Sequence, residues 1–591
     1  MNPIIEYAQA DVAIIGAGGA GLRAAIEIAR NDPQASIALI SKVYPMRSHT
    51  VAAEGGAAGV VRDDDSLDNH FNDTVSGGDW LCDQDVVQYF VEHATEEMIQ
   101  LEHWGCPWSR LPDGRANVRR FGGMKIPRTW FAADKTGFHI LHTLFQTSLQ
   151  YPSIKRFDEH FALDLLVENY ELKGVLVFDM QNGVVRAIAA KSVIIATGGA
   201  GRVFQYNTNG GIVTGDGMAL AYRHGLPLQD MEFVQYHPTG LPGSGILMTE
   251  ACRGEGGILT NKDGYRYLQD YGLGPETPLG EPKNKYMELG PRDRLSQAFY
   301  HEWKKGRTIE TARGAVVNLD LRHLGEAYIN ERLPFIRSLS KKFVGVDPVT
   351  APIPVRPTAH YTMGGIKTDI RCQTPLAGLF AIGECASVGL HGANRLGSNS
   401  LAELSVFGKV AGENALAHAS QQAFADKNQL MQLAQLGFAP FLRLLTQTEG
   451  QENPALIRHD LGLLMETHIG IYRSHDDCEQ AKRKIADLKA RYQNVKVTDK
   501  SLVFNTDWLT VIELGFLLDV AEAMIYSADA RTESRGSHQR LDYTERNDSD
   551  FLRHSLAYYN DRQPPDIRYA PVTITKSQPA QRAYGEAGEK K

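Results

Sequence analysis

Residues 11–21 read Asp-Val-Ala-Ile-Ile-Gly-Ala-Gly-Gly-Ala-Gly, and this stretch decides the fold. The apolar run 11–15 predicts a buried strand, an Ala-, Leu- and Ile-rich helix follows to about residue 30, and a second strand is predicted over 36–41. In this setting GxGxxG is typical of a dinucleotide site, because glycines allow a tight turn and close approach to a pyrophosphate, whose charge the helix N-terminus favours. A Gly-rich turn without a ligand is the less favoured alternative. The predicted cofactor-binding residues here are Gly16, Ala17, Gly18, Gly19, Ala20 and Gly21.

The end of the second strand bears on which dinucleotide binds. Ser41 and Lys42 stand where an NAD site usually carries an acidic residue. The missing carboxylate argues against NAD. A hydroxyl and an ammonium group suit the adenosine half of FAD.

Two further strand-to-glycine segments, 192–201 and 378–384, suggest one nucleotide-binding domain split by an insertion. We therefore predict an α/β fold in which a Rossmann-like FAD-binding domain is interrupted by a mixed α/β capping domain and followed by a helical domain and an irregular C-terminal segment. The predicted boundaries are 1–235 and 356–416 for the FAD-binding domain, 236–355 for the capping domain, 417–545 for the helical domain and 546–591 for the C-terminal segment, with disorder predicted from Ser577.

The composition narrows the function classes. The 591 residues carry a formal net charge of -8, which argues against nucleic-acid binding. No pair of cysteines has metal-ligand spacing, so neither a metal site nor an iron–sulfur cluster held by this chain alone is expected. The apolar segment 508–524 is too short to span a bilayer and is interrupted by acidic residues, so membrane association would need a partner. The six cysteines are Cys82, Cys106, Cys252, Cys372, Cys385 and Cys478.

Four longer motifs carry a family resemblance. They are Arg47-Ser48-His49-Thr50, Gln235-Tyr236-His237-Pro238-Thr239-Gly240, Arg356-Pro357-Thr358-Ala359-His360-Tyr361 and His391-Gly392-Ala393-Asn394-Arg395-Leu396-Gly397-Ser398-Asn399-Ser400. With them, nearly the whole chain resembles the flavoprotein subunit of fumarate reductases and succinate dehydrogenases, and most of all the quinol:fumarate reductases. A further family-like run, residues 531–538, is expected to join the C-terminal part to the flavin domain.

The resemblance implies a covalent FAD, joined at its 8α carbon to the ring of His49. Withdrawing electron density in this way makes the flavin easier to reduce. The alternative is that His49 is an ordinary loop histidine. Asp216 matches a flavin-contacting acid, although Asp before Gly is also common in turns, and Glu384 follows the third strand at a cofactor contact. Ser398, Asn399, Ser400 and Leu401 open a predicted amphipathic helix whose N-terminus would stabilise negative charge on the flavin, or they are plain caps. The remaining implied cofactor contacts are Ser48, Thr50, Glu54, Gly55, Gly56, His360, Tyr361 and Arg395.

The same resemblance implies a clamp for a small dicarboxylate. His237, His360 and Arg395 match its cationic and imidazole groups, and Thr249 matches a hydroxyl contact. Arginine suits this task because it binds carboxylates bidentately. Taken singly, each of these residues is also compatible with a surface ion pair or a core histidine.

Arg292 matches the arginine that the family uses as proton donor. A guanidinium hardly titrates, so we expect Glu250 and Arg253 to reprotonate Arg292 as it donates. Glu250 and Arg253 are three residues apart and would share one face if their segment is helical. A salt-bridge network that merely closes the cap is the alternative.

Together these expectations describe a catalytic subunit that reduces fumarate to succinate, with electrons from a quinol through an iron–sulfur subunit and membrane anchor subunits. It would lie at the cytoplasmic face of a bacterial inner membrane, held there by its partners. Glu54 favours a fumarate reductase, because succinate dehydrogenases carry Gln at this position. The alternatives are a succinate dehydrogenase, a soluble relative such as L-aspartate oxidase, which should lack the tethering histidine, and a non-catalytic flavin-binding electron carrier or scaffold, which need not keep the clamp residues together.

Overall fold

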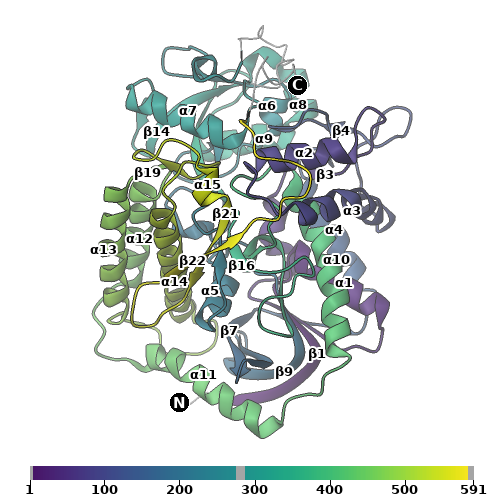
Figure 1. Ribbon diagram of the computed structural model, residues 1–591, viewed down its shortest axis with the longest axis vertical. Coiled ribbons are helices and arrows are strands. Elements are labelled where there is room, and N and C mark those ends of the chain that lie inside the picture. Colours follow the sequence, from purple (N-terminus) through teal and green to yellow (C-terminus); the bar gives the residue numbers. More distant parts are fainter. Residues whose placement is uncertain (1–3, 275–286, 583–591) are drawn as a thin grey trace.

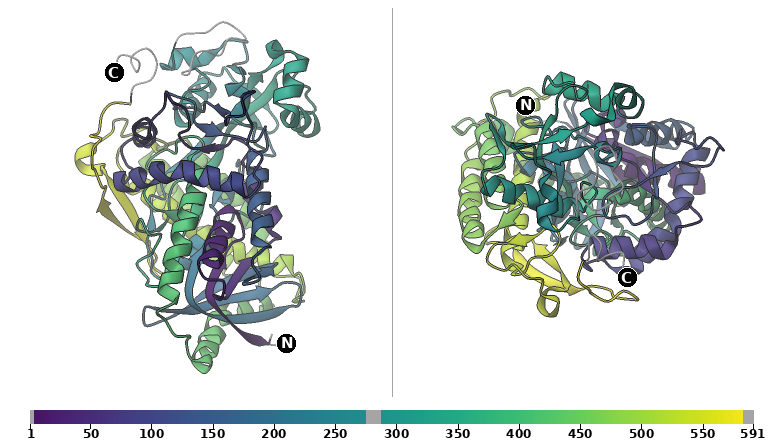
Figure 2. Two further views of the ribbon diagram at one scale, coloured as in Figure 1. Left: turned by 90° about the vertical axis from the view of Figure 1, so that its right-hand side faces the viewer. Right: turned by 90° about the horizontal axis from the view of Figure 1, so that it is seen from above.

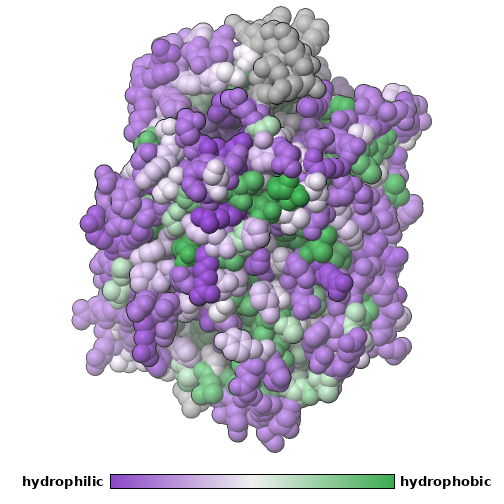
Figure 3. All heavy atoms as spheres, viewed as in Figure 1, coloured by the Kyte–Doolittle hydropathy of each residue, from purple (hydrophilic) through white to green (hydrophobic). Residues whose placement is uncertain are grey.

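The protein is described by a computed structural model that covers residues 4–274 and 287–582. Figure 1 shows an α/β part at the bottom, a helical part along the left side and a cap, residues 234–362, at the top. The face seen in Figure 3 is mainly hydrophilic, with apolar side chains in scattered patches. Across the described ranges, no helix has both the length and the apolar character that crossing a membrane requires.

The three predicted strand-to-glycine segments meet in one sheet. Strands β1 (Ile5–Ile15), β9 (Val184–Ile195) and β17 (Leu379–Ala381) are parallel neighbours, with β9 in the middle. Parallel strands end at the same edge of a sheet, so the three glycine turns open onto one place. The other strands of this sheet are β2 (Ile37–Ser41), β6 (Ile154–Asp158), β7 (His160–Glu168) and β8 (Glu171–Asp179).

Two helices pack against each other beside this sheet. Helix α1 (Gly19–Asn31) follows the first glycine turn, and α10 (Asn399–Ala419) runs along it, as the left view of Figure 2 shows. A side chain at Gly412 would come within 2.8 Å of the Ala24 carbonyl oxygen, so the close approach requires glycine there. Helix α10 is buried around most of its circumference rather than amphipathic as predicted, because both the sheet and α3 (Gln84–His103) cover it.

The cap is a mixed α/β insertion, as predicted. Chain segments enter and leave it through the antiparallel strands β11 (Val234–Gly240) and β15 (Ile353–Thr362). It has an apolar core of its own, built on β14 and its neighbouring helices. Its remaining elements are α6 (Ala251–Gly254), β12 (Ile258–Thr260), α7 (Arg292–Lys304), β13 (Ile309–Thr311), β14 (Gly314–Asp320), α8 (Glu326–Arg332) and α9 (Pro334–Phe343).

The helical part forms where helical periodicity predicts it. Its helices are α11 (Lys427–Thr446), α12 (Pro454–His468), α13 (His475–Tyr492) and α14 (Thr506–Ala530). Helix α14 is apolar on nearly all sides because it lies at the centre of this part, against α13, α12 and α5 (Asp216–Arg223). The shorter helices and strands elsewhere are α2 (Leu67–Gly77), α4 (Thr136–Ser148), α15 (Asp548–Phe551), β3 (Ala57–Ala58), β4 (Val118–Arg119), β5 (Thr129–Trp130), β19 (Tyr472–Arg473) and β20 (Gln539–Arg540).

The C-terminal segment is more regular than predicted. Strands β21 (Arg553–Tyr558) and β22 (Asp566–Pro571) form a hairpin that extends a sheet with β10 (Leu228–Gln229), β16 (Gly365–Lys367) and β18 (Ala386–Ser387). The prediction of disorder from Ser577 is wrong for residues 577–582, because the Ser577 backbone and hydroxyl both hydrogen-bond to the body of the protein. Residues 583–591 lie outside the described ranges.

Candidate active site

A cavity extends from the turn after β1 to the ends of β15 and the start of α10. It encloses about 1610 Å³ of empty space, part of it open to solvent. The predicted cofactor-binding residues that line it are Gly16, Ala17, Gly18, Gly19, Ala20, Ser41, Lys42, Ser48, His49, Thr50, Glu54, Asp216, His360, Tyr361, Glu384, Arg395, Ser400 and Leu401. Five others lie outside the lining: Gly21, Gly55, Gly56, Ser398 and Asn399.

The glycine turn is built for close backbone approach. Gly16 has φ +114°, and a Cβ there would lie 2.1 Å from the Ala196 carbonyl oxygen. At Gly21 a Cβ would lie 1.8 Å from the Gly16 carbonyl oxygen, so neither position tolerates a side chain. Helix α1 begins at Gly19, with its N-terminus at the cavity wall. This cradle suits a phosphate-bearing cofactor, because helix N-termini and bare backbone amides bind anions.

At one end of the cavity, Lys42 is held in place by carboxylates. Its Nζ lies 2.6 Å from Asp216 and 2.7 Å from Glu513, and it also donates to the Thr214 hydroxyl at 2.8 Å. Burial opposes the charge, but the two carboxylates raise the pKa of Lys42 above its usual value. Asp216 is the first residue of helix α5. It lines the cavity and also pairs with Lys42.

His49 lies in a short 3-10 turn on the cavity wall. Its Nδ1 accepts a hydrogen bond from the Gly210 backbone N–H at 3.3 Å. Burial, reinforced by the charge of Arg202, lowers the pKa of His49 to about 4. The ring is therefore neutral at physiological pH, and because Nδ1 accepts, its proton lies on Nε2.

No side chain caps the N-terminus of α10, so the alternative interpretation of Ser398 and Asn399 as plain helix caps is wrong. Ser398 has φ +69° and its hydroxyl pairs with Thr129, while the Asn399 amide bonds to His70 and Thr74. Ser400 Oγ accepts from Arg395 Nη1 at 2.7 Å. The side chains are thus committed to neighbouring segments, and the N-terminal turn with Ser400 and Leu401 faces the cavity.

Glu54 is a buried acid on the cavity wall, and its Oε2 has no hydrogen-bond partner. Burial, followed by the nearby Asp134, raises the pKa of Glu54 well above its usual value. Burial also lowers the pKa of the neighbouring Arg119 to about 10. Burial therefore favours the protonated form of Glu54, and a shifted pKa on a cavity wall marks a candidate functional group.

Two of the predicted clamp residues, His360 and Arg395, line the cavity, and His237 lies next to His360 outside this lining. The rings of His237 on β11 and His360 on β15 lie 5.1 Å apart, and Arg395 lies beside His360 on the same wall. Burial first, and the charge of Arg292 second, lower the pKa of both histidines well below the usual value; the same causes lower the pKa of Arg395 to about 10. His237 Nε2 is buried without a partner. Such unpaired groups are typical of a site that awaits a polar ligand.

Gln235 is a functional residue that the sequence did not single out. Its Oε1 accepts from Arg292 Nη1 at 3.2 Å and from Arg395 Nη2 at 3.1 Å, and its amide nitrogen is anchored to Asn394 and to the Arg395 carbonyl oxygen. The side chain is fully buried. It holds two like-charged guanidinium groups in one place with a neutral acceptor. Only its position in the Gln-x-His motif could have signalled this role.

The predicted relay forms a continuous chain of charged groups. Glu250 Oε2 lies 2.8 Å from both Arg292 Nε and Nη2, and 3.8 Å from Arg253 Nη2. Although burial opposes ionisation, the charges of Arg292 and Arg253 keep the pKa of Glu250 below its usual value. Glu250 directly precedes α6, so Arg253 returns to the same side as predicted. Thr249 is buried at the start of the same turn.

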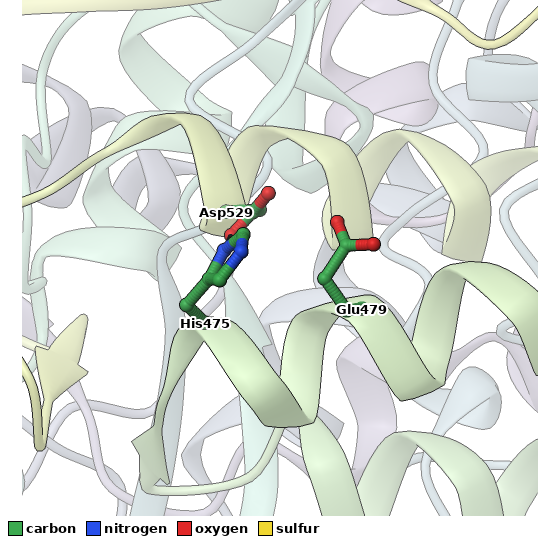
Figure 4. A group of neighbouring side chains, drawn as sticks. All are labelled: His475, Glu479 and Asp529. Atoms are coloured by element: carbon green, nitrogen blue, oxygen red, sulfur yellow. Dashed lines mark hydrogen bonds and ion pairs between the residues drawn. The ribbon is translucent and has the colours of Figure 1, made fainter.

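One group of side chains in the described residues has the spacing of a metal site. His475 and Glu479 on α13 face Asp529 on α14, as Figure 4 shows. The ammonium of Lys482 already bonds to Glu479 at 2.8 Å and to Asp529 at 2.5 Å. An ion-pair network therefore accounts for this cluster.

The expected junction of the C-terminal part is present. Arg531 donates to the Glu232 carboxylate at 2.5 Å, and Arg535 donates to the Asp79 carbonyl oxygen at 2.9 Å. Ser537 donates to the Ala393 carbonyl oxygen, next to Arg395. The run 531–538 thus braces the loop that carries one of the clamp residues.

The fold and the cavity define the class of protein: a flavoprotein with a two-part FAD-binding domain. Residues 11–401 match the family described as FAD binding domain, and residues 458–584 match the family described as Fumarate reductase flavoprotein C-term. The fumarate reductase flavoprotein subunit of Escherichia coli K12 is 65% identical over 579 residues, covering 98% of this chain and 96% of that protein. A solved E. coli quinol fumarate reductase variant has a TM-score of 0.97 at 64% identity, covering 98% of this chain and 99% of that one.

The succinate dehydrogenase flavoprotein subunit of Rickettsia bellii is more distant, at 40% identity over 591 residues, covering 97% of this chain and 96% of that protein. The chain belongs to the family of fumarate reductase flavoprotein subunits, within the wider group shared with succinate dehydrogenases. It is an FAD-binding oxidoreductase.

Proposed function

We propose that this chain is the catalytic subunit of a quinol:fumarate reductase and reduces fumarate to succinate. The observation that carries the proposal is the convergence of His237, His360, Arg292 and Arg395, all within reach of one another, where the FAD cavity ends. Buried guanidinium groups need anionic partners, and a dicarboxylate supplies two.

The chain fits FAD along the whole cavity. The glycine turn would admit the pyrophosphate, Ser41 and Lys42 would hold the adenosine half, and Glu384 and the N-terminus of α10 would hold the flavin half. When bound, FAD supplies the hydride that reduces the C=C bond of fumarate. The α10 N-terminus would stabilise negative charge on the ring, as helix N-termini do.

The clamp orients the substrate. Arg395 and Arg292 supply the cationic forks for its carboxylates, while the neutral imidazoles of His237 and His360 supply hydrogen bonds. The preorganised groups polarise the C=C bond without rearranging during the reaction. Thr249 is proposed as the additional hydroxyl contact.

Arg292 delivers the proton to the carbon opposite the hydride. The neutral form of a guanidinium is too unstable to persist, so the proton must be replaced as it leaves. Glu250 touches both Nε and Nη2 of Arg292 and is ideally placed for this transfer, and Arg253 stands behind Glu250. The 2.8 Å contacts are short enough for direct proton transfer between Glu250 and Arg292, which supports the relay.

His49 is proposed as the covalent tether to the flavin 8α carbon. Its neutral ring is held at Nδ1 by the Gly210 N–H, so Nε2 is the nitrogen that would bond to the flavin, and it would lose its proton when it does so. Acid denaturation of the FAD-loaded protein should leave flavin fluorescence on the polypeptide when the flavinylation machinery is present during expression. The His49→Ser variant should release all of its flavin. Release of all flavin from the wild type would rule out the tether.

Electrons are proposed to arrive from a membrane quinol through an iron–sulfur subunit and anchor subunits, with this chain peripheral on the cytoplasmic side of a bacterial inner membrane. Support comes from relatives that are quinol fumarate reductases. The alternative is a succinate dehydrogenase working in the oxidative direction. Glu54 and the 65% against 40% identities favour the fumarate reductase.

The decisive assay compares fumarate-dependent oxidation of a reduced dye with succinate-driven reduction of an oxidised dye. Arg292→Ala should abolish both reactions while FAD stays bound. Arg294→Ala is the matched control, because Arg294 lies on the same helix but is exposed. Retention of wild-type turnover by Arg292→Ala would refute the proton-donor role, and absence of both reactions in the wild type would refute the function.

A further inference from the structure

The segment after the β21–β22 hairpin forms a strap, residues 572–582, along the body of the protein. In Figure 1 it runs in yellow from β22 past α2 towards the cap. It is anchored on Gln84, which is fully buried: Gln84 Oε1 accepts from the backbone N–H groups of Thr575, Lys576 and Ser577 at 3.1, 3.0 and 2.9 Å, and its amide donates to the Ser577 carbonyl oxygen at 2.6 Å. A buried amide that satisfies four backbone groups makes this an ordered, built contact.

The strap ends on the cap. Arg582 donates to both carboxylate oxygens of Asp293, at 2.7 and 3.2 Å, and its Nη1 lies 3.9 Å from Asp79. The Arg582 side chain is 10% exposed and that of Asp293 is 1% exposed. Asp79 is fixed in turn by Arg546 at 2.8 Å and by the Gly536 N–H at 3.0 Å. One guanidinium therefore joins the cap to the turn between α2 and α3.

Asp293 is the residue next to the proton donor. Arg292 and Asp293 are the first two residues of α7, and their side chains bind different partners. Arg292 binds Glu250, and Asp293 binds Arg582. The chain before them is stiffened by Pro291. The first turn of α7 is thus held from two sides, once in the active site and once by the strap.

We propose that Arg582 is a positioning residue for the proton donor, acting through Asp293 on the first turn of α7. It touches no reacting atom. Its catalytic consequence rests on the proposed function, whereas the contact itself does not. A bidentate arginine–carboxylate pair fixes angle as well as distance, which a single ammonium contact does not.

Removing the Arg582 side chain leaves the nearly buried Asp293 carboxylate without its bidentate partner. The first turn of α7 then loses its contact with the strap and keeps the contact between Arg292 and Glu250 and the packing of Leu295. Because an error of about 1 Å in the position of a catalytic group lowers turnover by about 100-fold, we expect Arg582→Ala to lower kcat by roughly 10- to 100-fold. KM should rise less than kcat falls, since His237, His360 and Arg395 still hold the substrate and Arg292 is the one clamp group that is displaced.

The test uses the full-length, FAD-loaded protein. Steady-state kcat and KM for fumarate are measured for Arg582→Ala and Arg582→Lys, and amide hydrogen exchange is followed in the peptide that contains the start of α7. Arg568→Ala is the matched control, because Arg568 forms an exposed pair with Asp566 on the same C-terminal segment without reaching the cap. Asp293→Asn, alone and combined with Arg582→Ala, closes a double-mutant cycle.

We expect a lower kcat and faster amide hydrogen exchange at α7 in Arg582→Ala. Both should recover in part in Arg582→Lys, and neither should change in Arg568→Ala. The double variant should be no slower than Arg582→Ala alone. Wild-type kcat and exchange in Arg582→Ala, or independent losses in the double variant, would overturn it. If Arg582→Ala fails to fold, the Arg582→Lys and Asp293→Asn variants decide by the same criteria. If the wild type does not reduce fumarate, the proposed function fails, and hydrogen exchange alone still decides whether the strap holds α7.

Discussion

Replacing Gln235 by Met is the sharpest probe of how the active site holds its charges. Methionine keeps the length of the side chain but removes the oxygen that accepts from Arg292 at 3.2 Å and from Arg395 at 3.1 Å. Hydrogen bonds to charged groups contribute about 1.5–3 kcal/mol each. Both contacts are long and share one acceptor, so we take the combined loss as about 2–3 kcal/mol. This corresponds to roughly a 30- to 150-fold fall in kcat/KM for fumarate.

The assay is fumarate-dependent oxidation of a reduced dye, with FAD content measured in the same preparation. Gln235→Glu is the informative companion, because its carboxylate would neutralise the charge that the substrate needs. It should raise KM more than Gln235→Met does. A kcat/KM for Gln235→Met within threefold of wild type, at equal FAD content, would contradict the idea that this amide organises the two guanidinium groups.

Two further predictions concern stability. Lys42→Met should destabilise the protein by about 3–5 kcal/mol in chemical denaturation, because it leaves the buried carboxylate of Asp216 and the half-buried carboxylate of Glu513 without their shared cation; an unchanged midpoint would contradict this. Burial raises the pKa of Glu466 to about 7, so the folded state holds a proton that the unfolded state releases above about pH 4.5. The contribution of Glu466 to stability should therefore fall by about 3 kcal/mol as pH rises from 4.5 to 7 and stay constant above. Glu466→Gln should flatten this pH dependence, and an identical slope in both proteins would refute the assignment.

Much of the fold follows from local signals in the sequence. The apolar run before Gly16 and the two later strand-to-glycine segments predict parallel strands, because such runs have no amphipathic face and need cover on both sides. The structure places all three side by side. The proximity of Glu250 and Arg253 could also be predicted from the sequence, since residues three apart meet within a single helical turn.

The residues that the sequence could not reveal depend on contacts between distant segments. Gln235 acquires its role only because Arg292 and Arg395, 57 and 160 residues away, are brought to the same oxygen. The part of the strap from Ser577 onward was predicted to be disordered because its composition is polar. Composition does not show that the buried Gln84 side chain hydrogen-bonds to the Ser577 backbone. Ser398 resembles a cap by residue type, but its left-handed conformation directs its hydroxyl to Thr129.

The protonation states in the site explain why a dianion, rather than any carboxylate, should suit it. Burial and neighbouring cations keep His237 and His360 neutral, so the charges of the clamp and the proposed relay are those of Arg292, Arg395 and Arg253 and of the Glu250 carboxylate. Three positive charges and one negative charge leave a net charge of +2, which two substrate carboxylates cancel. A monocarboxylate would cancel only one of these two positive charges, and an uncompensated charge in a buried site is costly. Protonating the two histidines as well would overshoot neutrality by two charges. Their low pKa values are therefore part of substrate selection as well as a result of burial.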